Sequence, residues 1–186
     1  PMLQRTISQF LTDVYFGDLD FLLLDLPPGT GDVAITVGQL LPHSDVLIVT
    51  TPQPAAAGVA IRAGMLARQT GQRVIGVVEN MSAMMGPDGH TIDLFGTGGA
   101  QAVVDGLIQP VEINSTGALV STSSTSLGVL GQIPLSIGLR VGGDIGVPVV
   151  VHDPSDPAAI ALTELAQKIA TSGPSRAGKS LGLSPR

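Results

Sequence analysis

The chain has 186 residues, of which 44% are hydrophobic and 13% are charged, a composition typical of one globular domain and not of a disordered chain. The net charge of −6 and the small number of aromatic residues, four Phe and one Tyr, argue against a nucleic-acid partner, which needs basic and stacking side chains. No apolar run approaches the roughly 20 residues that span a bilayer, and the N-terminal residues lack the layout of a signal peptide. We therefore expect a cytoplasmic protein without a membrane partner.

Short apolar runs alternate with segments of helical periodicity along the chain. The runs that predict buried strands are residues 21–25, 46–50, 74–78 and 129–134, with a weaker candidate at 147–151. The segments that predict helices are residues 2–12, 32–41, 54–69, 98–107 and 157–171. Continuous apolar strands that alternate with helices predict an α/β fold, in which a mostly parallel sheet is covered by helices on both faces.

Two segments fall outside this alternation. Residues 115–126 contain eight Ser or Thr in twelve positions, so we place a surface insertion at about residues 111–128. Residues 173–186 are rich in Gly, Ser and Pro and predict a flexible tail, which leaves residues 1–172 as one domain.

The tail contains GPSRAGKS, from Gly173 to Ser180, which has the spacing of a phosphate-binding loop. Such a loop joins a buried strand to a helix, whose N-terminus and backbone N–H groups hold the phosphates. This match instead follows a predicted helix, Pro174 removes one backbone donor, and too few residues follow for a second helix. We therefore expect no nucleotide at this match.

A stronger signal is LLLDLPPGTGD, at residues 22–32. In P-loop enzymes an acid at the end of a strand holds the Mg²⁺ shell, and a glycine shortly after it meets the γ-phosphate. Asp25 and Gly29 have this spacing, and glycine lets a backbone N–H approach a phosphate closely. The segment also fits a strand that ends in an ordinary Asp-Pro turn, so by itself it leaves both interpretations open.

Five motifs follow one another in order: DLPPGTGD, VTTP at 49–52, VVENMS at 77–82, FGTGGA at 95–100 and GQIPL at 131–135. In this order they resemble the Mrp family of iron–sulfur cluster carrier ATPases, in the MinD-like branch of P-loop NTPases. The resemblance covers about residues 1–151, without the Ser/Thr-rich insertion. It implies a homodimer that binds ATP and Mg²⁺, hydrolyses ATP, and passes iron–sulfur clusters to acceptor apoproteins.

The resemblance also implies roles for particular residues. Asp25 resembles the acid that orients the Mg²⁺ shell, an indirect metal contact, and Gly29 resembles the γ-phosphate sensor. Asn80 resembles the residue that hydrogen-bonds the adenine ring, for which an amide offers both a donor and an acceptor. Pro134 and Leu135 resemble the loop beside the base. As alternatives, Asn80 fits a strand-end cap, and Pro134 and Leu135 fit an ordinary strand end.

The chain departs from the family at its phosphate loop, which in the family precedes DLPPGTGD. Nothing upstream of Phe21 resembles it. We therefore expect a domain that is incomplete at its N-terminus, the C-terminal portion of a longer ATPase. In the loop beside the base, Ser136 stands where the family commonly has Asp.

A second departure concerns the cluster ligands. The family usually carries a C-x-x-C pair between its ENMS and FG motifs, and a bridging [4Fe–4S] cluster takes two thiolates from each subunit. Here the interval reads AMMGPDGHTIDL, and the chain has no Cys. Met84 and Met85 are weak neutral donors, and His90 is a lone imidazole in a predicted turn. We assign no iron–sulfur ligands.

Three functions follow from these observations. The favoured one is part of an ATP-dependent iron–sulfur carrier or assembly factor, with hydrolysis gating cluster binding or release. A MinD-like membrane regulator would need a basic amphipathic helix, and the last predicted helix has no cationic face. A non-enzymatic interaction or dimerisation module is the alternative that the missing loop and missing cysteines favour. The coding sequence upstream of Pro1 would discriminate between the first and third functions.

Overall fold

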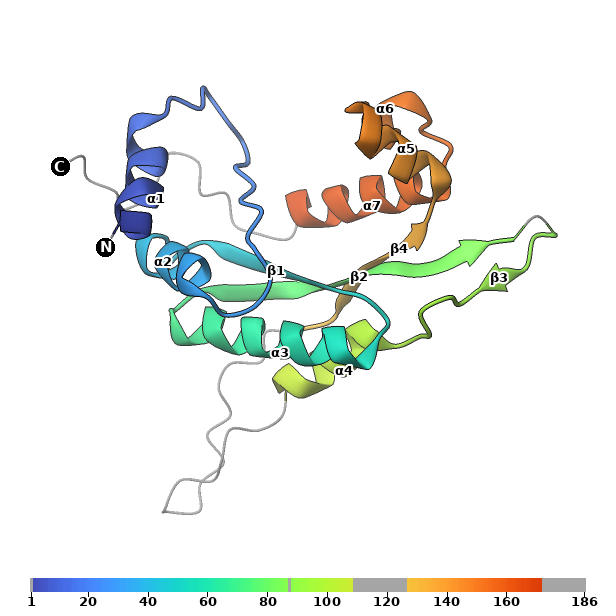
Figure 1. Ribbon diagram of the computed structural model, residues 1–186, viewed down its shortest axis with the longest axis horizontal. Coiled ribbons are helices and arrows are strands. Elements are labelled where there is room, and N and C mark those ends of the chain that lie inside the picture. Colours follow the sequence, from blue (N-terminus) through green and yellow to red (C-terminus); the bar gives the residue numbers. More distant parts are fainter. Residues whose placement is uncertain (1, 87, 109–126, 172–186) are drawn as a thin grey trace, which may run out of the picture.

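The computed structural model describes residues 2–86, 88–108 and 127–171 as seven helices and four strands in one α/β unit (Figure 1). In chain order the elements are α1 (Met2–Asp13), α2 (Asp32–Leu40), β1 (Asp45–Thr50), α3 (Pro54–Gln69), β2 (Arg73–Met85), β3 (Thr91–Ile92), α4 (Gly99–Ile108), β4 (Val129–Leu135), α5 (Ile137–Ile145), α6 (Val149–His152) and α7 (Pro157–Thr171). The predicted insertion lies almost wholly outside the described residues, and the predicted tail, with its GPSRAGKS match, lies entirely outside them.

The sheet is mostly parallel, as predicted. β2 is its middle strand and pairs in parallel with β1 on one side and with β4 on the other. β3 pairs in antiparallel with the far end of β2, so that these two strands form a hairpin. At the opposite end of β1 and β2, Arg73 donates to both carboxylate oxygens of Asp45, at 2.9 and 2.7 Å, and this hydrogen bond raises the pKa of Arg73.

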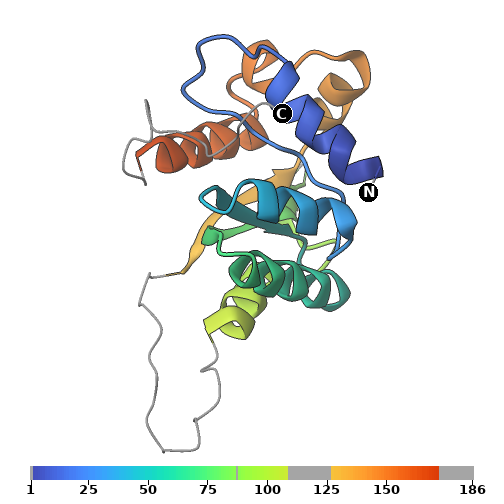
Figure 2. The same ribbon diagram turned by 90° about the vertical axis from the view of Figure 1, so that its left-hand side faces the viewer.

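Helices cover both faces of the sheet (Figure 1, Figure 2). α3 and α4 pack on one face, in a core that includes Val77, and α7 packs on the other face, in a core that includes Val78. Successive residues of a strand point to opposite faces, so β2 contributes to both cores. The helices approach closely because their buried positions are small: Ala57, Ala60 and Ala67 in α3, and Ala158 in α7. None of the described helices combines the length and apolar character needed to cross a membrane.

Two predicted strands are wrong. Residues 21–27 form no strand and their side chains are exposed, with Leu23 at 84%. A strand needs a neighbour for its backbone hydrogen bonds, and no described strand pairs with this segment. Residues 147–151 instead lead into α6, because Pro148 lacks the donor that a central strand requires and precedes the first turn of the helix.

The outer edge of β1, on the side away from β2, is exposed. Among the described residues no strand pairs with this edge, since β1 bonds to β2 alone. Val49, near the carboxyl end of β1, is 58% exposed, and the apolar segment 21–26 is exposed as well. Apolar side chains of this size are normally buried in a parallel sheet, so this edge is exposed where a sheet of this kind is usually covered.

Candidate functional site

Four of the five motifs meet at one edge of the sheet. Parallel strands end at the same edge, where α/β proteins bind their ligands. The register places Thr50 of β1 beside Glu79 of β2, and Glu79 beside Gln132 of β4. VTTP, VVENMS and GQIPL therefore end side by side. FGTGGA joins them, because the backbone N–H of Ala100 bonds to Glu79.

Asn80 lies where β2 leaves the parallel part of the sheet. It pairs with Ile133 of β4, so Pro134 and Leu135 follow directly on the neighbouring strand, and all three predicted base-contacting residues are half-buried and close in the fold. The Asn80 Oδ1 accepts a hydrogen bond from the Met81 N–H at 2.9 Å, which is the contact of a strand-end cap. An amide bonded in this way still has its NH₂ donor and a second acceptor lone pair.

Met81 changes the direction of β2. Its φ of 56° is the one positive value among the described non-glycine residues, and this left-handed backbone is unusual for a side chain with a Cβ. The pairing of β2 with β4 is interrupted between Asn80 and Met84, as expected for a bulge. The Asn80 Oδ1 bond stabilises this turn in the strand, so β2 continues as a hairpin arm that projects beyond the helical layers (Figure 1).

Glu79 is a functional candidate that the sequence analysis did not weigh. Its side chain is 1% exposed. Its Oε2 accepts from the Ala100 N–H at 2.8 Å, and its Oε1 accepts from the Gln132 Nε2 at 2.8 Å. The first turn of a helix carries partial positive charge, which favours a carboxylate at this position. An acid inside the otherwise apolar run VIGVVE was the signal in the sequence.

The start of α4 is packed closely against the loop after β1. Gly96 and Gly98 have φ values of 84° and 83°, so the chain enters the helix through a left-handed backbone that suits glycine. A Cβ on Gly99 would lie 2.1 Å from the backbone oxygen of Thr51, closer than any real contact. The glycines of FGTGGA therefore allow the helix start to reach VTTP.

Asp25 and Gly29 lie in the exposed segment between α1 and α2, and no described strand joins this segment to the sheet. Gly29 has a φ of 90°, so the predicted switch turn does use a conformation that favours glycine. The acid and the glycine of the motif are therefore not held by strand pairing, whereas Asn80, Pro134 and Leu135 lie on paired strands. The proposed roles of Asp25 and Gly29 rest on the motif.

Ser136 has a local structural role. Its Oγ accepts from the Leu139 N–H at 3.0 Å, which caps the N-terminus of α5, and donates to the Asp156 Oδ2 at 2.5 Å. Asp156 in turn accepts from the Ala158 N–H at 2.8 Å and so caps α7. The residue in the place of the family's usual Asp thus joins the starts of two helices.

The interval that carries cysteines in the resembled family is the β2–β3 hairpin. At its turn the Gly86 N–H donates to the His90 carbonyl at 2.8 Å, and the His90 N–H donates to the Asp88 Oδ1 at 3.1 Å. His90 is exposed, as expected for a turn residue. Within the described residues no three His, Cys, Asp or Glu side chains come together as a metal site would require.

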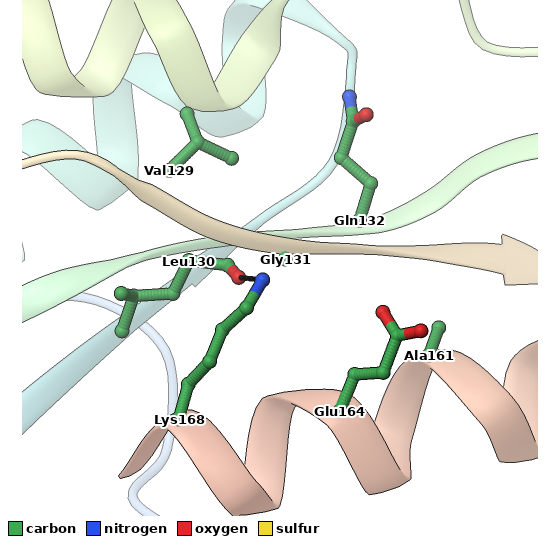
Figure 3. A pocket seen from close by; sticks show the side chains of 7 residues that line it. All are labelled: Val129, Leu130, Gly131, Gln132, Ala161, Glu164 and Lys168. Carbon is green, nitrogen blue, oxygen red and sulfur yellow. Dashed lines mark hydrogen bonds between the residues drawn. The ribbon is translucent and has the colours of Figure 1, made fainter. Parts of the chain in front are cut away.

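A hollow of about 330 Å³ lies elsewhere, between the outer edge of β4 and α7. In Figure 3 the Lys168 Nζ donates to the Leu130 carbonyl, at 2.8 Å, while the Gln132 side chain points to the opposite face of the strand. None of Asp25, Gly29, Asn80, Pro134 and Leu135 lines this hollow. We therefore place the candidate site at the carboxyl ends of the strands and not here.

The family model of the ParA/NUBPL iron-transfer P-loop NTPases matches residues 1–170. The chain belongs to this family. An iron–sulfur cluster carrier protein of Mycobacterium tuberculosis H37Rv is 52% identical over 185 residues, which are 100% of this chain and 45% of that protein. The carrier protein of Pyrococcus horikoshii is 35% identical over 170 residues, 91% of this chain and 51% of that protein. This member of the family thus spans about half the length of these curated relatives.

Solved structures agree with the NTPase fold. A nucleotide-binding protein from Archaeoglobus fulgidus, in complex with ADP, is 26% identical with a TM-score of 0.57, over 100% of this chain and 59% of that one. The septum site-determining protein MinD of P. horikoshii, complexed with Mg-ADP, is 21% identical with a TM-score of 0.59, over 91% and 56% of the two chains. The predicted MinD-like α/β fold is confirmed, and the NTPase family agrees with the resemblance of the five motifs.

Proposed function

We propose that this chain forms the base-binding wall and the second switch of an ATP-dependent iron–sulfur cluster carrier. The observation that carries the proposal is the convergence of VTTP, VVENMS, FGTGGA and GQIPL at one edge of the sheet. Family membership supports the nucleotide as ATP and the cargo as a cluster. As a whole, the carrier is a cytoplasmic homodimer that hydrolyses ATP to gate cluster binding or release to acceptor apoproteins.

In this proposal the base is held by the sheet. The NH₂ group and remaining lone pair of Asn80 bond the edge of the adenine ring, and Pro134 and Leu135 pack beside it. Asp25 orients the Mg²⁺ shell, and the Gly29 N–H approaches the γ-phosphate. Bound Mg²⁺ neutralises the charge that develops on the phosphates during transfer to water. An exposed carboxylate and a glycine turn at φ 90° fit these roles.

The cluster does not fit the donors of this chain. A [4Fe–4S] cluster is held by thiolates, and the chain contains no Cys. This absence favours the second candidate function, an interaction or dimerisation module without enzymatic activity. Nucleotide binding discriminates between the two, because the module needs no ATP.

The first prediction is that this chain alone binds ATP–Mg²⁺ negligibly, because no segment before Phe21 surrounds the phosphates. Isothermal titration calorimetry should show no saturable heat at micromolar ATP. When a segment that carries the phosphate loop of the resembled family is fused before Pro1, saturable binding should appear. A fusion that stays silent would support the non-enzymatic module. Tight binding by the unfused chain that Lys179→Ala abolishes would show that GPSRAGKS is a real site.

The second prediction is that the chain takes up no stoichiometric cluster on anaerobic reconstitution with iron and sulfide, since it offers no thiolate. Iron and sulfide analysis after desalting, with the absorption spectrum, measures this. A brown protein with iron and sulfide in a fixed ratio to the chain would contradict the prediction. His90→Ala would then test the imidazole first.

A further inference from the structure

The buried carboxylate of Glu79 connects three segments that are distant in the sequence. It lies on β2, takes a hydrogen bond from the start of α4 and takes another from Gln132 of β4, both at 2.8 Å. Burial of an ionised group costs several kcal/mol unless the group is well bonded. The motif VVENMS contains one acid, Glu79, and this acid is buried. Its hydrogen bonds hold the three segments together, and the proposed contacts to ATP do not involve it.

Two of these segments, the part of β2 at Glu79 and the start of α4 at Ala100, flank the projecting arm. We define the arm as residues 81–86 and 88–98, which contain the β2–β3 hairpin. It begins at Met81, two residues after Glu79, where the pairing of β2 with β4 is interrupted until Met84 pairs with Leu135, and it ends at Gly98, two residues before Ala100. The arm itself has little cover, since Met85, Ile92 and Leu94 are 59%, 39% and 56% exposed. Its direction therefore depends on its base.

We propose that Glu79 is a positioning residue that fixes the base of this arm relative to Asn80. The hydrogen bond between Glu79 and Ala100 connects the residues just before and just after the arm. The hydrogen bond between Glu79 and Gln132 attaches this connection to β4, two residues before Pro134. Asn80 is the next residue along β2, so the groups proposed to bind the base and the arm share one rigid support. That this support serves nucleotide binding rests on the proposed function; that it holds the arm does not.

The test is amide hydrogen exchange of the chain without nucleotide, followed by mass spectrometry. Glu79→Met keeps the length of the side chain but leaves the Ala100 N–H without its acceptor. Exchange in the arm and in the first turn of α4 should rise by about tenfold or more, because Glu79→Met removes both hydrogen bonds of the carboxylate. Glu79→Gln should restore most of the protection, because its amide oxygen can accept from Ala100 while Gln132 rotates to accept from its NH₂ group.

Asp45→Asn is the matched control. It weakens the Arg73–Asp45 pair at the opposite end of β1 and β2, so it lowers stability without touching the base of the arm. The proposal would be overturned if Glu79→Met accelerated exchange equally in all peptides or left the arm unchanged. It would also be overturned if Glu79→Gln restored no protection.

If Glu79→Met does not fold, the variant Gln132→Ala replaces it. Gln132 is exposed, and its substitution removes one of the two hydrogen bonds of Glu79. It should speed exchange about threefold, as for a weaker hydrogen bond, in the same peptides only; an unchanged arm would again overturn the proposal.

Discussion

Asp25→Asn is expected to lower ATP hydrolysis on the order of 100-fold in a form of the protein that carries the upstream phosphate loop. The change keeps the shape of the side chain and removes the negative charge that orients the Mg²⁺ shell. Losing a single group that stabilises transition-state charge has an effect of this size. Nucleotide binding in the absence of Mg²⁺ should change little, because the carboxylate acts through the metal.

Steady-state phosphate release and Mg²⁺-free nucleotide titration measure the two quantities. Asp20→Asn is the matched control, since it removes another exposed carboxylate, five residues before Asp25 and outside DLPPGTGD. Hydrolysis that survives Asp25→Asn at the level of the Asp20 variant would mean that DLPPGTGD is an ordinary turn.

Asn80→Ala is expected to weaken ATP and ADP binding alike, by about 5- to 150-fold, because both nucleotides carry the same base. The range corresponds to about 1–3 kcal/mol, the cost of losing a hydrogen bond and leaving a buried partner unsatisfied. Discrimination against GTP should weaken at the same time. Calorimetric titration of the fusion with ATP, ADP and GTP measures all three affinities.

Asn80→Asp separates the two roles of this side chain. Aspartate keeps an oxygen to accept from the Met81 N–H but has no NH₂ group to donate to a purine. If both substitutions weaken ATP binding, the amide contacts the base. If Asn80→Asp binds ATP with unchanged base preference, Asn80 is a strand-end cap and the adenine assignment is wrong.

The parts of the fold that the sequence predicts are those whose partners lie within the described residues. α3 and α7 have their predicted bounds, and β1, β2 and β4 contain the predicted apolar runs, because each of these strands pairs with a neighbour and contributes to a core beneath the helices. Residues 21–25 have an equally apolar sequence, yet they form no strand without a neighbour. The apolar pattern of a segment indicates its tendency to be buried in a sheet. Whether the segment forms a buried strand depends on a neighbouring strand with which it can pair.

The missed helix α5 did have signals in the sequence. Ser136 caps its start, and Gly146, with a φ of 71°, ends it. These two residues bracket a helix in the usual way, and they indicate it by capping and not by apolar periodicity. In the candidate site, the ends of parallel strands bring Asn80, Pro134 and Leu135 close together, and their contacts to a base stay a prediction. The role of Glu79 depended on a contact with α4, 21 residues later, that spacing alone does not reveal.

The unpaired edge of β1 has a consequence for work with this chain in solution. Within the part of the chain that the structure describes, no strand pairs with this edge of β1, and an exposed edge strand is a template for association with any other exposed strand, including the same edge of a second molecule. Such association grows with protein concentration and needs neither nucleotide nor cluster. A dimer measured by light scattering or sedimentation is therefore informative about the proposed homodimer only when this edge takes no part in it.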